Sequence, residues 1–265
     1  MIQSKTVISF HFIKLNLHTF FKTIQTLLII LFSLFLFHCS STEKDQTTAE
    51  GLFAYAQEFD EAERYEVALQ KYADVKNKFP YHKLATEAEL AIADVHFKRE
   101  SYTEAELSYQ NFRELHPKHP KSDYVLFKIA MSFYKQLPET IDRDLSQGDE
   151  AIYHFDELIK LYPNSEYANE SKKNKDEVLS KLAQKELYIA DFYLKQEIYS
   201  SALRRYEGLI KKFPSIGFDP NAHYGAILSA RGLDDKASEK KHTDELLKTY
   251  PKSEQAAKLK NKETE

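Results

Sequence analysis

The sequence is poor in the residues that build most local chemical sites. It has one cysteine, no tryptophan, six glycines and eight prolines in 265 residues. A lone thiol cannot form an internal disulfide. There is also no glycine-rich phosphate loop and no His-Glu-x2-His metal motif. We therefore expect a protein that is not an enzyme and that has no cofactor or metal.

An excess of positive charge is also missing. The formal net charge is -4, and the first 38 residues contribute three lysines and no acid, so the chain from Cys39 onward carries -7. Nucleic-acid-binding domains carry a basic face. The charge balance therefore argues against nucleic acid as a partner.

No apolar run is long enough to span a bilayer. The longest, from Leu27 to Phe37, has eleven residues and is interrupted by Ser33, whereas a transmembrane helix needs about 20. A lysine-bearing segment, a short apolar run and a cysteine in succession are typical of a bacterial lipoprotein signal peptide. We interpret residues 1–38 as that peptide, Cys39 as the lipidation site and residues 39–48 as a polar tether. The alternative is a short N-terminal anchor with an incidental cysteine, because His38 stands where a small residue is usual.

A spaced pattern fills the rest of the chain. A small residue is followed by an aromatic one four positions later and by a proline eight positions after that. The four copies are Ala68-Tyr72-Pro80, Ala105-Tyr109-Pro117, Ala151-Phe155-Pro163 and Ala202-Tyr206-Pro214. This spacing matches the second helix of a tetratricopeptide (TPR) repeat, and the proline ends that helix because it has no N–H to donate.

The fold class that follows is all-α, a TPR α-solenoid of about five helical hairpins within residues 49–265. The predicted units are about 49–82, 83–120, 121–166, 184–216 and 220–253. The third is expected to contain an inserted loop, residues 136–148, and the fourth to be preceded by a longer helix from Asn169 to about Ala183. A solenoid offers a concave wall suited to holding other proteins.

Several stretches resemble the BamD (ComL-type) family of TPR lipoproteins, which belong to the bacterial outer-membrane β-barrel assembly machinery. The stretches that carry the resemblance are Phe79-Pro80-Tyr81, His116-Pro117-Lys118-His119-Pro120, Asp123-Tyr124-Val125, Asp142-Arg143-Asp144 and Tyr162-Pro163-Asn164-Ser165-Glu166-Tyr167. A generic TPR array does not require the double His-Pro or the acidic-basic-acidic loop.

The resemblance implies an outer-membrane location on the periplasmic face, with the lipid on Cys39 as anchor. It implies three kinds of protein partner: a core barrel-assembly subunit with periplasmic domains, other assembly lipoproteins, and unfolded outer-membrane β-barrel proteins. It further implies that the C-terminal repeats dock the core subunit and that the N-terminal repeats receive the C-terminal strand of a barrel precursor. The alternative is a periplasmic TPR scaffold that coordinates cell-envelope or cell-wall synthesis at division. A third alternative is a hydrolase that carries TPRs as an appendage, but no stretch outside the repeats is long enough to form a catalytic domain.

The first helix of each hairpin should line the concave face, so its exposed positions are the candidate groove. An extended segment could place its side chains against the rings there and its backbone donors against the acids. The alternative for any one of these residues is simple packing between repeats. The candidates are Phe53, Gln57, Asp60, Leu90, Asp94, Phe97, Tyr124, Phe127, Met131 and Tyr134.

Three smaller groups have two interpretations each. Asp142, Arg143 and Asp144 are expected to brace the inserted loop, with a partner contact as the alternative. Arg204 and Arg205 could dock an acidic partner or form a solvated face. His116 and His119 could hold a metal, but each precedes a proline and no third ligand lies nearby, so a turn explains them better.

Overall fold

The computed structural model describes Gln25 and residues 45–262. The chain divides into two units, residues 1–45 and residues 46–265. All the helices considered below belong to the second unit. The predicted signal peptide, Cys39 and most of the tether lie outside the described residues.

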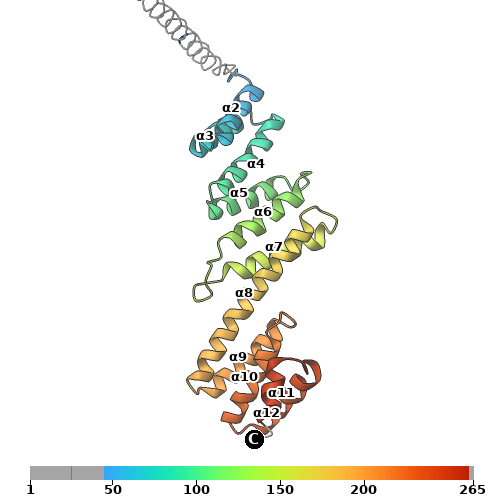
Figure 1. The fold of residues 1–265 in the computed structure, drawn as a ribbon. Coiled ribbons are helices and arrows are strands. Elements are labelled where there is room, and N and C mark those ends of the chain that lie inside the picture. The colour runs from blue at the N-terminus through green and yellow to red at the C-terminus, as the bar shows by residue number, and fades with distance from the viewer. Residues whose placement is uncertain (1–24, 26–44, 263–265) are drawn as a thin grey trace, which may run out of the picture. The chain divides into compact units, whose positions relative to one another are not determined.

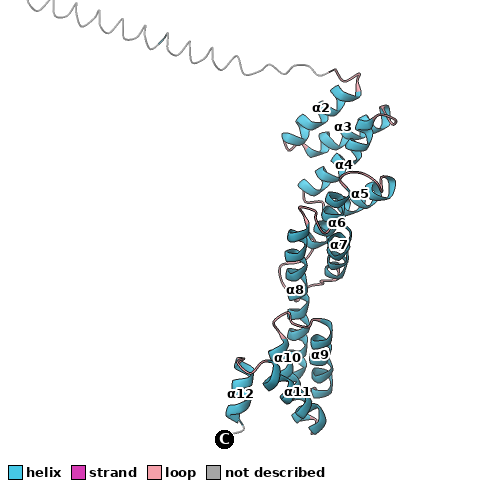
Figure 2. Ribbon diagram, turned by 90° about the vertical axis from the view of Figure 1, so that its right-hand side faces the viewer, coloured by secondary structure: helices cyan, strands magenta, loops and turns pink. Residues whose placement is uncertain are grey.

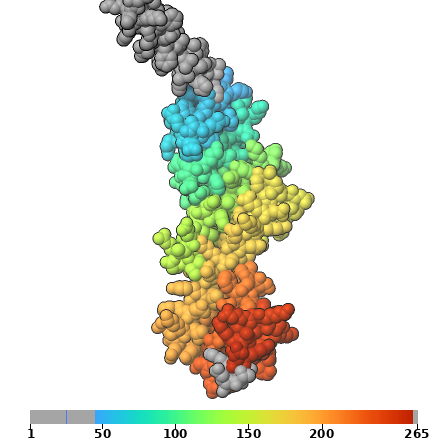
Figure 3. Space-filling model, in the orientation of Figure 1, coloured from blue at the N-terminus to red at the C-terminus, as the bar shows by residue number. Residues whose placement is uncertain are grey.

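The regular structure of residues 45–262 is helical throughout (Figures 1 and 2). This confirms the all-α TPR assignment. Helices α2 to α11 each pack mainly on the helix before and the helix after, whereas α12 packs more on α10 than on α11. In the space-filling view the hairpins follow one another in chain order (Figure 3). The helices are α2 (Ala49–Glu61), α3 (Tyr65–Lys78), α4 (Lys83–Lys98), α5 (Tyr102–Leu115), α6 (Ser122–Lys135), α7 (Gln147–Leu161), α8 (Ala168–Lys195), α9 (Tyr199–Lys212), α10 (Asp219–Gly232), α11 (Lys236–Thr249) and α12 (Glu254–Lys262).

Four hairpins share the same tight turn. Glu63, Glu100, Glu197 and Asp234 each adopt a positive φ between 56° and 62° at the same place, two residues before the second helix begins. A left-handed residue ends the first helix and lets the chain reverse. The third hairpin lacks this turn and carries the inserted loop instead, between α6 and α7.

The repeated alanine and aromatic residue form the centre of each of the first four hairpins. Ala105 and Tyr109 are fully buried, as are Ala202 and Tyr206. The tyrosine hydroxyl needs a partner because burial without a hydrogen bond is costly. Tyr206 donates to Asp191 Oδ1 over 2.6 Å. An aspartate directly after the small residue of the first helix therefore supports the tyrosine of the second.

The third hairpin changes both members of that pair. Phe155 replaces the tyrosine and has no hydroxyl group, while Met131 stands where the second and fourth hairpins have Asp94 and Asp191. Both side chains are buried. The loss of the donor and the loss of the acceptor occur together, so this pair of positions leaves neither a hydroxyl group nor a carboxylate unpaired.

Helix α8 is continuous for 28 residues and serves two hairpins. The fourth predicted unit, 184–216, therefore begins inside a helix. No glycine or proline interrupts residues 168–195. The first half of α8 packs on the third hairpin, where Val178 joins that hairpin's core. The second half packs on α9 and α10, where Ala183 and Ala190 are fully buried.

A buried histidine pair lies where the fourth and fifth hairpins meet. His223 of α10 and His242 of α11 are 5% and 2% exposed, and their Nδ1 atoms are 3.1 Å apart. His242 Nε2 lies 3.3 Å from Glu207 Oε1 of α9. A cavity of about 600 Å³ borders both rings. Since two N–H groups cannot face each other at this distance, at least one imidazole is neutral.

Candidate functional site

Five of the predicted groove residues border one hollow between the first two hairpins. Phe53, Gln57 and Asp60 come from α2, and Leu90 and Asp94 come from α4. Spacings of three and four residues place them on one face of each helix. The hollow has a volume of about 280 Å³. The prediction that Leu90 faces a ligand is wrong, because its side chain is 2% exposed and packs in the core.

Asp94 is the polar centre of this groove. The hydroxyl groups of Tyr109 and Tyr124 both donate to its Oδ1 atom, over 2.6 and 2.7 Å. Burial, followed by the nearby Asp94 carboxylate, raises the pKa of both tyrosines, so they remain donors at neutral pH. Because both bonds end on Oδ1, Oδ2 can accept a hydrogen bond from a ligand.

Asp60 is engaged differently. Lys98 Nζ lies 2.7 Å from Oδ2 and 2.8 Å from Oδ1, so one ammonium group occupies both carboxylate oxygens. The Asp60 side chain is 10% exposed. Of the two acids predicted to accept ligand backbone donors, Asp94 has an oxygen available and Asp60 is held in an ion pair.

Aromatic rings continue the groove toward the third hairpin. The Lys128 amino group lies 3.8 Å from the centroid of the Phe97 ring and 5.6 Å from that of Tyr124. Burial lowers the pKa of Lys128, and Asp94 opposes this shift. The cation lies between two predicted groove residues, and the faces of their rings are electron-rich.

Two predicted groove residues of the third hairpin lie inside the stack. Phe127 is 6% exposed and stacks on Tyr167, with ring centroids 4.8 Å apart. Met131 is 8% exposed, and its sulfur accepts from Asn174 Nδ2 of α8. These side chains pack α6 against α8 and against Tyr167, the residue just before α8. They offer little surface to a ligand.

Tyr134, the last predicted groove residue, reaches α8. Its hydroxyl donates to Glu177 Oε2 over 2.7 Å. This hydrogen bond, together with burial, raises the pKa of Tyr134 to about 12. Its ring lies edge-on to Phe155. Tyr134 therefore ties α6 to α8 while remaining partly exposed.

Several groove residues were not foreseen from the sequence. Lys128 could have been found, since it lies one turn after Tyr124 and one turn before Met131 on the same helix. Lys121 could not, because it precedes α6 and reaches the groove through the turn. The hollow is also lined by Tyr72, Leu84, Glu87, Ala91 and Lys121.

The inserted loop is held by lysines of α8. The Nζ groups of Lys181 and Lys185 donate to the backbone carbonyl groups of Pro138 and Arg143. Neither contact was predictable, because a backbone acceptor has no sequence signature. The tie fastens the loop to the middle of α8.

The acidic and basic side chains of the loop lie at its surface. Asp142, Arg143 and Asp144 are all exposed. Asp144 accepts hydrogen bonds from the backbone N–H of Ser146, over 3.0 Å, and from its hydroxyl group, over 2.8 Å. Asp144 thus shapes the approach to α7, and Asp142 and Arg143 are accessible to a partner.

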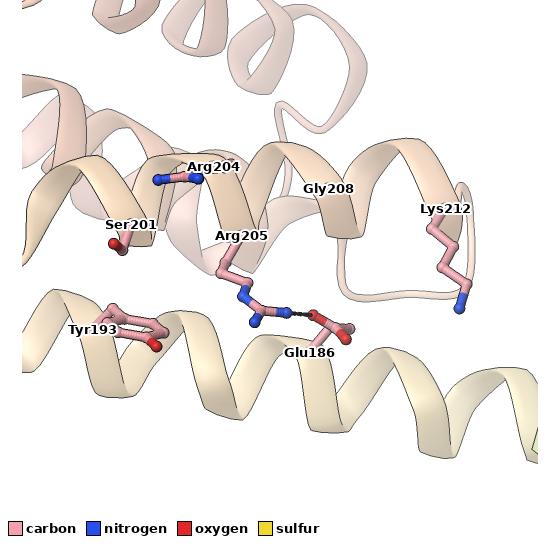
Figure 4. A pocket seen from close by; sticks show the side chains of 7 residues that line it. All are labelled: Glu186, Tyr193, Ser201, Arg204, Arg205, Gly208 and Lys212. Atoms are coloured by element: carbon pink, nitrogen blue, oxygen red, sulfur yellow. Dashed lines mark hydrogen bonds and ion pairs between the residues drawn. The ribbon is translucent and has the colours of Figure 1, made fainter. Parts of the chain in front are cut away.

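Arg204 and Arg205 border a second hollow, of about 430 Å³, between α8 and α9. Arg205 Nη1 lies 3.1 Å from Glu186 Oε2 of α8, and Lys212 marks the far end of the hollow (Figure 4). Three cations border the hollow, of which Arg205 pairs with Glu186 and Lys212 lies 3.5 Å from Asp149 Oδ1 of α7. Tyr193 adds an aromatic wall. The composition fits an acidic group on a binding partner.

His116 and His119 lie where α5 ends and α6 begins. His116 Nε2 is 2.7 Å from Glu89 Oε2, and both imidazoles lie against the Phe112 ring, with centroids 4.8 and 5.0 Å away. The pair closes the turn around an aromatic side chain. Residues 45–262 contain no cluster of three or more metal-ligating side chains arranged to hold an ion.

Comparison with known proteins places this arrangement in a family. The model of the YfiO family, described as an outer membrane lipoprotein, matches residues 45–242. The chain belongs to the YfiO family. The match begins before α2 and includes all of the groove and the basic hollow between α8 and α9.

Curated proteins similar to this chain carry one name and are covered over most of their length. The outer membrane protein assembly factor BamD of Neisseria gonorrhoeae is 29% identical over 216 residues, covering 78% of this chain and 80% of that protein. The protein of the same name from Rickettsia prowazekii is 30% identical over 192 residues, covering 72% and 75%.

A solved TPR structure also matches, more loosely. The P58(IPK) TPR domain covers 78% of this chain and 53% of its own, with 15% sequence identity and a TM-score of 0.41. Within the described part of this chain, no helix is both long and apolar enough to cross a bilayer.

Proposed function

We propose that this chain is an outer-membrane protein assembly factor that works as a TPR scaffold without catalysing a reaction. It docks the core barrel-assembly subunit, meets other assembly lipoproteins and receives unfolded outer-membrane β-barrel proteins. The observation that carries this proposal is the family match over residues 45–242, together with the name of the relatives. That name favours barrel assembly over a scaffold for cell-wall synthesis.

The anchor and the location belong to the same proposal. The family description, outer membrane lipoprotein, supports lipidation of Cys39 and a position on the periplasmic face. A single acyl chain binds a membrane marginally, whereas several hold a protein firmly. Changing Cys39 to serine should therefore release the protein from the membrane fraction.

Asp94 gives the substrate groove a specific chemistry. Its Oδ2 can accept a backbone N–H from an extended peptide, and Phe53 and Phe97 supply apolar surface alongside, whereas Leu90 is buried in the core. Extended strands recognise partners through backbone hydrogen bonds and alternate side chains. The C-terminal strand of a barrel protein, which ends in an aromatic residue, fits these requirements.

Asp94→Asn tests the groove. The amide replaces the free acceptor with a donor, so the affinity for a synthetic C-terminal strand peptide should fall about tenfold or more, because a hydrogen bond to a charged group contributes about 1.5–3 kcal/mol. Fluorescence anisotropy with a labelled peptide measures this affinity.

Asp191→Asn is the matched control. Asp191 supports Tyr206 over 2.6 Å just as Asp94 supports Tyr109, but Asp191 is absent from the groove. Asp94→Asn should lose the more stability, because Asp94 also accepts from Tyr124, and only Asp94→Asn should lose peptide affinity. Equal affinities for the two variants would rule out the groove.

Arg204 and Arg205 are proposed to dock the core subunit. The double variant Arg204→Glu/Arg205→Glu places two acids in the basic hollow, so co-purification of the core subunit should fall strongly at physiological salt. Lys172→Glu/Lys173→Glu makes the same charge change at exposed positions of α8 and should leave co-purification intact. Retention of the subunit by the arginine variant would show that it docks elsewhere.

A further inference from the structure

The second half of α8 has an uncovered face that resembles the stacking face of the other first helices. Aligning α4 and α8 by the fully buried Ala93 and Ala190 places Phe192 at the position of Val95. Val95 is completely buried against the preceding hairpin. Phe192 is 52% exposed, and Tyr188, one turn earlier, is 57% exposed.

The length of α8 explains why this face is open. In the second repeat the preceding hairpin packs directly on α4. In the fourth repeat the preceding hairpin packs on the first half of α8 instead, through contacts such as Tyr134 with Glu177. The inserted loop of that hairpin reaches along α8 as far as Lys185, which donates to the Arg143 carbonyl group. Residues 188–195 are therefore left without the helix that would normally cover them.

The spacing along this face is that of a helix-packing seam. Lys181, Lys185, Tyr188, Phe192 and Lys195 follow one another at intervals of four, three, four and three residues. Such spacing keeps side chains in line for an adjacent helix. The two aromatic rings lie at the centre and lysines lie at both ends.

The charge of the seam defines the chemistry of its partner. All three charged positions are lysines, and Lys185 meets a neutral backbone carbonyl group rather than an acid. Phe192 lies edge-on to Tyr193, with ring centroids 5.8 Å apart, and Tyr193 also lines the basic hollow of Arg204 and Arg205. The seam is thus continuous with a second basic surface.

We propose that this seam binds an amphipathic helix of a partner protein, with apolar residues on Tyr188 and Phe192 and acidic residues on Lys185 and Lys195. The helix completes the repeat stack that the long α8 interrupts. This inference rests on the proposed function, because it adds a surface to the docking of the assembly machinery.

Photo-crosslinking in the native envelope tests the seam. The full-length, lipidated chain carries p-benzoylphenylalanine in place of Tyr188 or Phe192, and mass spectrometry identifies the crosslinked peptide. We expect both positions to capture the same segment, one that is helical and acidic. The exposed Tyr153 of α7 serves as the control position and should not capture it. Absence of a protein crosslink, or capture of lipid, a second copy or a basic segment, would overturn the inference.

Variants separate this inference from the proposed function. Lys195→Glu should reduce the crosslink at least fivefold while the thermal unfolding midpoint stays unchanged, because Lys195 is exposed and, unlike Lys185, does not hold the inserted loop. An unchanged crosslink would contradict the charge argument. A crosslinked acidic helix from a protein outside barrel assembly would support the seam and refute the function. A co-purifying barrel subunit without any crosslink would support the proposed function and refute the seam.

Discussion

Replacing Gly225 by alanine is expected to lower the free energy of unfolding by about 1–3 kcal/mol, the usual cost of overpacking a core. A Cβ at this position of α10 would lie 2.5 and 2.6 Å from the two Cε atoms of Tyr206. Real Cβ atoms do not approach other atoms so closely. The Tyr206 ring cannot withdraw, since it is fully buried and its hydroxyl is bonded to Asp191.

Gly208→Ala provides the matched control for that experiment. Gly208 lies inside α9, and a Cβ there would meet no other atom within 4 Å. Alanine has a better helix propensity than glycine by about 1 kcal/mol, so this variant should be more stable than the wild type. Chemical denaturation of both variants measures the difference. If Gly225→Ala is as stable as Gly208→Ala, then α9 and α10 do not pack as closely as described.

Mild acid is expected to loosen the junction of the fourth and fifth hairpins. Burial lowers the pKa of His223 and of His242, and each ring's charged neighbours modify the shift. The surrounding charged groups are Glu207 and Lys211 of α9, Asp219 of α10, and Lys241 and Glu245 of α11. A folded pKa below the unfolded value of 6.5 means that the fold favours the neutral imidazoles.

The direction of the pH dependence follows from those shifts. Above pH 6.5 the two imidazoles are mainly neutral in both the folded and the unfolded chain, so their contribution to the free energy of unfolding is fully present. As the pH falls through 6.5 the unfolded chain binds protons and the folded chain does not, so the free energy of unfolding decreases by up to about 1.4 kcal/mol per pH unit for each histidine. The loss continues until the lowered folded pKa is reached.

Urea denaturation between pH 7.5 and 5.5 measures how the free energy of unfolding changes with pH, in a range above the usual pKa values of carboxylates. The variant His223→Gln/His242→Gln should show a shallower slope, and the remainder belongs to His96 and His154, whose pKa values burial also lowers. A slope identical to that of the wild type would show that the buried pair does not titrate in this way.

The sequence predicted the second helices well because their constraints are local. An alanine, an aromatic residue and a proline at fixed spacing define a close helix contact, a core ring and a helix end, and residues such as Ala105 and Tyr109 are buried as that pattern requires. The inserted loop of the third repeat was predicted for the same reason, since it interrupts the spacing.

The partners of those residues depend on contacts between distant segments. Nothing in the spacing indicates that Tyr109 and Tyr124 share one oxygen of Asp94, or that Phe127 stacks on Tyr167. The continuity of α8 could have been predicted from the absence of glycine and proline between residues 168 and 195. It determines which face of the fourth repeat is covered, and it places Met131 beneath Asn174 instead of in an open groove.

The most direct test is to purify the tagged full-length protein from its own detergent-solubilised envelope and to identify its companions by mass spectrometry. Barrel assembly predicts recovery of a large outer-membrane barrel protein with periplasmic domains, together with other lipoproteins. Recovery of cell-wall enzymes without any such barrel would contradict it.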